Sequence, residues 1–251
     1  MDAYIICATP RTGSTLLCDL LSSTRVAGEP DSFFMRDPDP VWAARWRLPD
    51  RRAAVEPQGA AAFLAAAGQA GRGQTGIFGA RLMQEDRDDL MAMARVAYPG
   101  QPSDLARIRA AFGRVLFIHL TRVDKLAQAV SLVRAEQSGL WHIAPDGSEL
   151  ERLAPPQPPQ YDFARIEAAR IDLARRDGDW CDWFDREGIR PLRLEYADLS
   201  SDPAGSVGQI FGALGLRTPD PRSLRSGVAR LSDGMSAEWI ARYRSDAARA
   251  R

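Results

Sequence analysis

Lysine is almost missing from this chain of 251 residues, since Lys125 is the only one. Lys+Arg and Asp+Glu each number 33, so the formal net charge is zero and no global field favours nucleic acid or a membrane surface. Cysteine is scarce too. Cys7, Cys18 and Cys181 form no CxxC or zinc-ligand spacing, and such a sparse, odd set favours buried thiols in a reducing cytoplasm.

Long hydrophobic runs are also lacking. The apolar run at the N-terminus is short, has no basic leader and ends at Pro10, so we expect no secretory signal. The alanine-rich window 60–67 is well below the ~20 residues that a membrane span needs. We therefore expect a cytoplasmic protein without stable membrane insertion, folded as one domain over residues 1–251.

The most informative segment is the turn between the apolar run 4–8 and the leucine-rich run 16–21. The first run predicts a buried parallel strand, and the leucine spacing predicts one face of a helix. A tight turn between a strand and a helix presents backbone N–H groups and the positive helix end to one point. The sequence therefore predicts an anion site here, with phosphate as the expected ligand.

This turn departs from the phosphate loop of nucleoside triphosphatases, G-x-x-x-x-G-K-[ST]. Ser14 stands where the lysine for the β- and γ-phosphates belongs, and Arg11 supplies a cation earlier in the loop. The later apolar run 115–120 ends in Thr121-Arg122 instead of the magnesium-binding aspartate of a Walker-B strand. Both departures argue against ATP hydrolysis or kinase chemistry, and no metal is expected.

Apolar runs and helical periodicity alternate along the rest of the chain. Strands are predicted at 4–8, 76–83, 115–120 and 190–196, and helices at 86–97, after Asp124, and at 161–187, 203–214 and 237–244. This alternation predicts an α/β fold in three layers, a parallel sheet with helices on both faces and a P-loop-like nucleotide site. Residues 37–73 are expected to form an acceptor cap or dimerisation insert, and 139–160 a mobile loop bordered by a proline-rich run.

Binding sites of parallel sheets lie at the carboxyl ends of the strands, where Arg11 and Arg122 both fall. Ser131 follows Arg122 by about two turns of helix. A guanidinium and a hydroxyl in this arrangement are suited to a second phosphate, although Ser131 is equally consistent with a serine bonded back to its own helix. Two phosphate sites indicate a nucleotide phosphorylated at two places on its ribose.

In these residues the chain resembles the sulfotransferases that use 3′-phosphoadenosine 5′-phosphosulfate (PAPS). Within them it is most similar to the bacterial carbohydrate sulfotransferases, the group typified by the mycobacterial trehalose 2-sulfotransferases. Five blocks in the same order carry the resemblance: 9–17 (TPRTGSTLL), 28–34 (GEPDSFF), 79–83 (GARLM), 118–131 (IHLTRVDKLAQAVS) and 236–243 (SAEWIARY).

The resemblance implies roles for individual residues. It implies that the 5′ end of PAPS is bound by Arg11, Thr12, Gly13, Ser14 and Thr15. It also implies that the 3′-phosphate is bound by Arg122 and Ser131. Glu29 would be the general base for a sugar or glycolipid hydroxyl, and Phe33 and Arg81 would contact that acceptor. The segment 230–234 would close over the donor. The resemblance also implies a homodimer.

The sequence departs from the trehalose enzymes at two of these blocks. Ser32 stands where they have a second glutamate after Gly-Glu-Pro, and Arg81 stands where they have lysine. These changes leave donor binding intact and put trehalose itself in doubt as the acceptor. Arg81 either faces the sulfate or pairs with Glu85.

Several alternatives stay open at this level. Glu29 also fits an ordinary exposed loop glutamate, and His142 is a second candidate base, whereas His119 in mid-strand is expected to be a packed core imidazole. Three tryptophans either stack on sugar rings or pack internally: Trp42, Trp46 and Trp141. Two rival functions remain, a P-loop kinase for a small molecule and a non-catalytic nucleotide-binding module.

Overall fold

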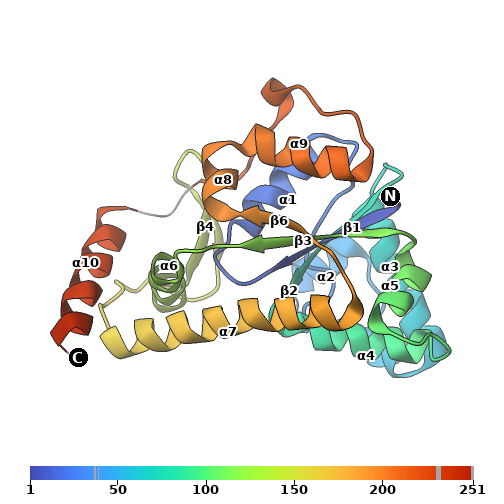
Figure 1. The fold of residues 1–251 in the computed structure, drawn as a ribbon, viewed down its shortest axis with the longest axis horizontal. Helices are drawn as coiled ribbons and strands as arrows, with labels where there is room; N and C mark the ends of the chain where they lie inside the picture. The colour runs from blue at the N-terminus through green and yellow to red at the C-terminus, as the bar shows by residue number, and fades with distance from the viewer. Residues whose placement is uncertain (37, 39, 230–232, 250–251) are drawn as a thin grey trace.

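Four parallel strands form the sheet at the centre of the molecule (Figure 1). The computed structural model describes residues 1–36, 38, 40–229 and 233–249, and the sheet has the order β2-β1-β3-β6. Ala3 lies opposite both Phe78 and Val115, so the three longest strands start level and end at one edge. The predicted strands are confirmed, with these bounds: β1 (Ala3–Ala8), β2 (Phe78–Met83), β3 (Val115–Thr121) and β6 (Leu192–Glu195).

Each face of the sheet has its own apolar core, because successive side chains of a strand point to opposite faces. Ala3, Ile5 and Cys7 face one cluster, while Tyr4, Ile6 and Ala8 face the other. The first layer contains α3 (Pro57–Arg72), α4 (Arg87–Ala97), α5 (Asp104–Phe112) and the second half of α7 (Phe163–Glu187), and the second contains α1 (Ser14–Ser23) and α9 (Pro203–Leu214). The predicted three-layer α/β fold is confirmed.

A third apolar cluster joins α6 (Lys125–Ser138), α7 (Phe163–Glu187) and α10 (Gly234–Arg249). Trp239 and Tyr243 of α10 pack with Val133 of α6 and Leu173 of α7, and Figure 1 shows α10 beside the end of α7. The helix predicted over 161–187 is confirmed, and it continues through Gly178.

The segment 139–160 is more ordered than the loop that the sequence predicted. It contains an antiparallel hairpin of β4 (Leu140–Ile143) and β5 (Glu149–Arg152), in which His142 pairs with Glu151. Every residue of the two strands is half-buried or exposed, so no apolar run marks them in the sequence. The mobility of this segment stays a prediction.

The expected insert 37–73 contains α2 (Pro40–Trp46), the 3-10 helix η1 (Arg51–Val55) and α3. Its residues 37 and 39 lie outside the described part of the chain. Phe63 and Leu64 of α3 are buried in the core beneath the sheet, so α3 belongs to a covering layer of the domain. The role of the segment as an acceptor cap or in dimerisation stays a prediction.

Four short elements complete the chain, and none of them was predicted as such. They are α5, α8 (Tyr196–Ser201) and the 3-10 helices η2 (Gln84–Asp86) and η3 (Pro221–Ser223). Ser103 caps α5 by accepting a hydrogen bond from the backbone N–H of Ala106 at 3.1 Å. α8 follows β6 directly and lies at the same edge of the sheet as the turn after β1 (Figure 1).

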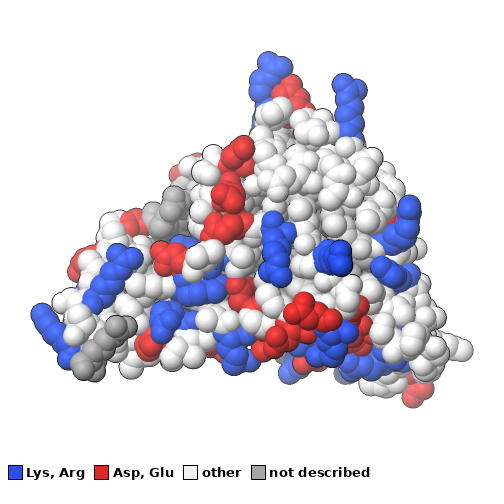
Figure 2. Space-filling model, in the orientation of Figure 1, with Lys and Arg blue, Asp and Glu red and all other residues white. Residues whose placement is uncertain are grey.

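Charges of both signs are interspersed on the face of the molecule drawn in Figure 2. Within the described residues, no helix has the length and apolar character needed to cross a bilayer.

Candidate active site

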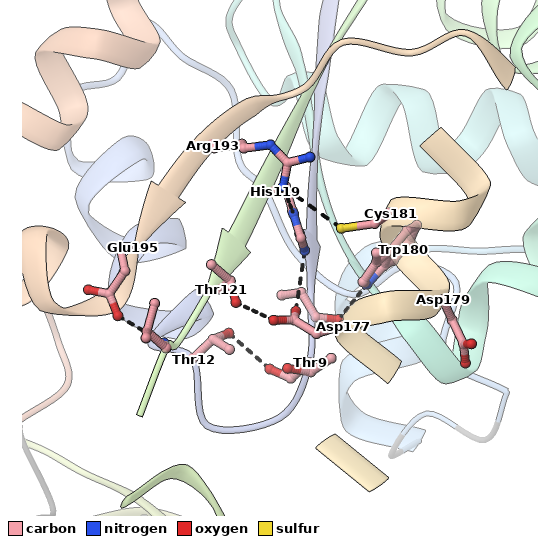
Figure 3. A network of polar contacts seen from close by, with 12 residues as sticks. Thr9, Thr12, His119, Thr121, Asp177, Asp179, Trp180, Cys181, Arg193 and Glu195 are labelled. Atoms are coloured by element: carbon pink, nitrogen blue, oxygen red, sulfur yellow. Dashed lines mark hydrogen bonds and ion pairs between the residues drawn. The ribbon is translucent and has the colours of Figure 1, made fainter. Parts of the chain in front are cut away.

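The turn after β1 forms a closed loop at the carboxyl edge of the sheet, as the sequence predicted. Thr9 and Thr12 are fully buried, and the Thr12 hydroxyl donates to the Thr9 carbonyl at 2.9 Å (Figure 3). Gly13 has a φ of 80°, and a Cβ atom there would lie 2.8 Å from the Tyr196 ring, so only glycine fits. α1 then starts at Ser14, and its first turn carries no acidic residue to compete for an anion.

Arg11 and Arg122 meet at this loop. The Arg11 Nε donates to Ser131 Oγ at 3.0 Å, and its Nη1 donates to the Trp141 carbonyl at 2.7 Å. The Arg122 guanidinium lies over the Tyr196 ring at 4.6 Å, and its Nη1 donates to the Arg11 carbonyl at 3.3 Å. Ser131, which the sequence analysis placed with Arg122, is a hydrogen-bond partner of Arg11 and lines the same cavity as Arg122.

Arg11 and Arg122 both line one cavity of about 700 Å³, which we call the donor cavity after the ligand that the sequence resemblance implies. Burial lowers the pKa of Arg11 to about 10, and repulsion from Arg122 acts in the same direction. Arg11 is still a cation at neutral pH. Two cations beside an open helix N-terminus have the charge that suits a multiply charged anion. The remaining loop residues that line it are Pro10, Gly13, Ser14 and Thr15.

A second cavity of about 790 Å³ adjoins the first, and we call it the acceptor cavity after the same expectation from the sequence. Six residues line both cavities and form their common wall: Thr15, Trp42, Arg81, His142, Glu151 and Val228. Arg81 holds this wall together, since its Nε donates to Ser32 Oγ and its Nη1 to Thr15 Oγ1, both at 2.7 Å. The alternative pairing of Arg81 with Glu85 is wrong, because Glu85 pairs with Arg176 at 2.9 Å.

Glu29 lines the acceptor cavity and is exposed to solvent there. Its backbone N–H donates to the Gly71 carbonyl at 2.8 Å, which fixes the turn against the end of α3. Gly28 before it has a φ of 80°, and a Cβ atom there would lie 2.5 Å from the Ile77 carbonyl oxygen. Gly28 therefore allows the tight turn that places Glu29 at the acceptor cavity.

Phe33 contributes less surface to the site than the sequence suggested. It is 2% exposed, and its ring packs edge-on against Trp46 at 5.4 Å. Trp46 is itself buried, with its indole N–H donating to Asp31 Oδ2 at 3.0 Å, so it packs internally. Trp42 lines both cavities. Trp141 lines the donor cavity, and its carbonyl accepts a hydrogen bond from Arg11.

The hairpin brings both His142 and Glu151 to the common wall. The sequence analysis named His142 but missed Glu151. His142 Nε2 lies 3.2 Å from Thr15 Oγ1 and 3.3 Å from Glu151 Oε2. Burial and the nearby Arg11 and Arg81 lower the pKa of His142 to about 3, so its imidazole is neutral at physiological pH. Burial raises the pKa of Glu151. No motif marks Glu151 in the sequence, because its position follows from a hairpin that was not predicted.

His119 is a buried core imidazole, as predicted. Its Nε2 lies 3.2 Å from Asp177 Oδ1, behind the loop (Figure 3). Across the described residues, no group of three or more His, Cys, Asp or Glu side chains could hold a metal ion. Of the expected closing segment 230–234, residues 230–232 lie outside the described part of the chain.

The fold and these two cavities define a class of protein, an α/β protein in which the loop between the first strand and the first helix lines one cavity that adjoins a second. A family model described as Stf0 sulphotransferase matches residues 3–246. The chain therefore belongs to the Stf0 sulfotransferase family.

Two relatives match over almost their whole length. A trehalose 2-sulfotransferase of Mycolicibacterium smegmatis is 32% identical, and one of Mycobacterium tuberculosis is 30% identical. Each alignment covers 98% of this chain and 96% of the relative. A solved structure of the sulfotransferase STF1 from Mycobacterium tuberculosis aligns with a TM-score of 0.36 at 16% identity, over 95% of this chain and 76% of that one.

Proposed function

We propose that this sulfotransferase moves the sulfuryl group of PAPS to a hydroxyl of a carbohydrate or glycolipid. The observation that carries the proposal is that Arg11, Arg122 and the loop after β1 line one cavity, which shares a wall with a second. The trehalose enzymes among its relatives support a sugar as acceptor. Trehalose itself is one candidate among sugars, because Ser32 and Arg81 differ from those enzymes.

In the proposed complex the loop binds the 5′ end of PAPS. Backbone N–H groups of Arg11, Thr12, Gly13, Ser14 and Thr15 contact the phosphosulfate, together with the side chains of Arg11, Ser14 and Thr15. The 3′-phosphate is contacted by Arg122 and Ser131. The buried side chain of Thr12 closes the loop onto Thr9. The acceptor oxygen attacks sulfur in line, and negative charge builds up on the bridging oxygen that leaves. Arg11 and the end of α1 stabilise this charge, which is the main contribution expected of the protein.

A base must take the proton of the acceptor hydroxyl as the new S–O bond forms. We assign this step to Glu29, because its carboxylate is exposed in the acceptor cavity. Arg81 and an edge of Phe33 complete the acceptor's surroundings. His142 is the second candidate, since it lies on the common wall and is neutral at physiological pH.

We further propose that the enzyme works in the cytoplasm as a homodimer. Cys7, Cys18 and Cys181 are all free thiols, which suits a reducing compartment. Analytical ultracentrifugation tests the dimer directly, and a sedimenting mass equal to that of one chain at all concentrations would contradict it.

The function is tested first by binding and then by transfer. Calorimetry should detect adenosine 3′,5′-bisphosphate, the product of the donor, and no magnesium-dependent binding of ATP. Labelled PAPS should then transfer its sulfuryl group to a member of a panel of trehalose, glycolipids and lipopolysaccharide. Magnesium-dependent ATP binding would favour a kinase, and tight bisphosphate binding without transfer to any acceptor would favour a non-catalytic module.

A further inference from the structure

The only lysine of the chain lies behind the loop after β1. Lys125 starts α6, and its side chain is 17% exposed. Its ammonium donates to Asp177 Oδ2 at 2.7 Å, to Gln128 Oε1 at 3.2 Å and to Thr121 Oγ1 at 3.4 Å. An ammonium has three N–H donors. Each of them has an acceptor here, so the group is held in one orientation.

Gln128 extends this contact to the loop. Its side chain is fully buried, and its Nε2 donates to Thr9 Oγ1 at 3.0 Å and to the Pro10 carbonyl at 2.6 Å. A side-chain amide has one accepting end and one donating end. The Lys125 ammonium at Oε1 therefore fixes the orientation of the Gln128 amide, since the reversed amide would place its NH₂ group against Lys125.

Asp177 of α7 anchors the ammonium from the other side. Its carboxylate also accepts hydrogen bonds from His119 and from the Thr121 hydroxyl. Burial alone would raise the pKa of Asp177, but the hydrogen bonds from His119, Lys125 and Thr121 together lower it to about 2. The carboxylate is thus charged whenever the protein is at a physiological pH.

The loop needs such support because its backbone is strained. Arg11 has a φ of 66°, which is uncommon for a residue other than glycine, whereas Gly13 adopts its φ of 80° freely because it has no Cβ atom. Strained conformations of this kind persist when the surrounding structure fixes them. Gln128 fixes the start of the loop at Thr9 and Pro10, and the Thr12 hydroxyl closes it onto Thr9.

We propose that Lys125, held by Asp177, is a positioning residue that sets the loop through Gln128 and thereby determines affinity for the 5′ end of the donor. The proposal deepens the proposed function and rests on it.

The variant Lys125→Met tests the proposal. The dissociation constant for adenosine 3′,5′-bisphosphate, measured by calorimetry, should rise at least about tenfold. The KM for PAPS should rise with it, while the KM for the acceptor stays unchanged. In the ligand-free variant, hydrogen exchange of residues 9–15 should be faster than in the wild type, and Lys125→Arg should restore part of the affinity.

A matched control separates positioning from general stability. Asp104 is another buried carboxylate, and its side-chain partners Arg95, Arg107 and Trp183 lie outside the loop. Asp104→Asn should lower the melting temperature and leave bisphosphate affinity and loop exchange unchanged. If Lys125→Met is too unstable to purify, Gln128→Met removes the link to the loop and keeps Asp177 paired with Lys125, with the same expected results.

Unchanged affinity and unchanged loop exchange in Lys125→Met and Gln128→Met would overturn the proposal. Failure of the wild-type protein to bind adenosine 3′,5′-bisphosphate would instead refute the proposed function. The exchange measurement on the ligand-free protein still decides the positioning role in that case.

Discussion

At the scale of single residues, we propose that arginine side chains carry the chemistry of this site. Arg11 and Arg122 line one cavity, and an anion bound between them would relieve their mutual repulsion. A planar guanidinium also matches the oxygens of phosphate and sulfate in a two-pronged contact. The single lysine, by contrast, lies behind the loop in a network of hydrogen bonds. The two types of cation thus have separate tasks.

Gly13→Ala tests whether the loop depends on its backbone conformation. The φ of 80° and the 2.8 Å approach to the Tyr196 ring leave no room for a methyl group. We expect a loss of about 1–3 kcal/mol in the free energy of unfolding, measured by urea denaturation, together with weaker bisphosphate binding. Gly100→Ala is the control, because nothing lies within 4 Å of its added Cβ atom. Equal free energies of unfolding for Gly13→Ala and wild type would contradict the expected conflict between a side chain at residue 13 and the Tyr196 ring.

Glu29→Gln tests the assignment of the base. The amide keeps the shape of the side chain and cannot take a proton, so kcat should fall about 10²–10⁴-fold, while calorimetry shows unchanged bisphosphate affinity. His142→Gln is the comparison variant. Normal turnover of Glu29→Gln combined with loss of turnover in His142→Gln would identify His142, and not Glu29, as the base.

At the scale of elements, helices and strands with strong apolar patterns could be predicted, and weakly packed ones could not. α7 was recognised because Ile166, Leu173, Trp180 and Phe184 lie on one buried face. The hairpin was missed because its strands pair only with each other and bury no apolar stripe. Glu151 was missed with it.

Gly178→Ala should stabilise α7. This glycine lies in the exposed interior of the helix, and nothing lies within 4 Å of an added Cβ atom. Alanine is favoured over glycine in such a position, so the free energy of unfolding should increase by about 0.5–1 kcal/mol, measured by urea denaturation. Gly71→Ala in α3 is the opposite case, since its Cβ atom would lie 2.4 Å from the Gly79 carbonyl oxygen. An increase in the free energy of unfolding for Gly71→Ala would contradict the close packing of α3 on β2.

At the scale of the whole molecule, the fold class followed from local signals. Parallel strands covered on both faces are continuous apolar runs, and each lies in its own stretch of sequence. The layout of the site depends on long-range contacts that no local pattern encodes. Arg11 contacts Ser131 and Trp141, more than a hundred residues away, so the pairing of Ser131 with Arg122 alone was incomplete.

The stability of the whole molecule should depend on Asp177 at low pH. Its pKa is lowered from 3.8 to about 2 in the folded state, so its contribution is present above pH 4 and is lost as the pH falls toward 2. The full effect is about 2 kcal/mol, and about half of it is lost by pH 3. The difference in unfolding free energy between wild type and Asp177→Asn should therefore shrink between pH 7 and pH 3. A constant difference in urea denaturation would contradict the lowered pKa.

The central claim is that Arg11 and Arg122 bind opposite ends of one adenosine that is phosphorylated at both its 3′ and 5′ positions. Its most direct test compares the affinities for adenosine 3′,5′-bisphosphate and adenosine 5′-monophosphate in wild type and Arg122→Ala by calorimetry. We predict that the wild type prefers the bisphosphate by at least about tenfold and that Arg122→Ala loses this preference while still binding the monophosphate. An unchanged preference in Arg122→Ala, or none in the wild type, would contradict the account.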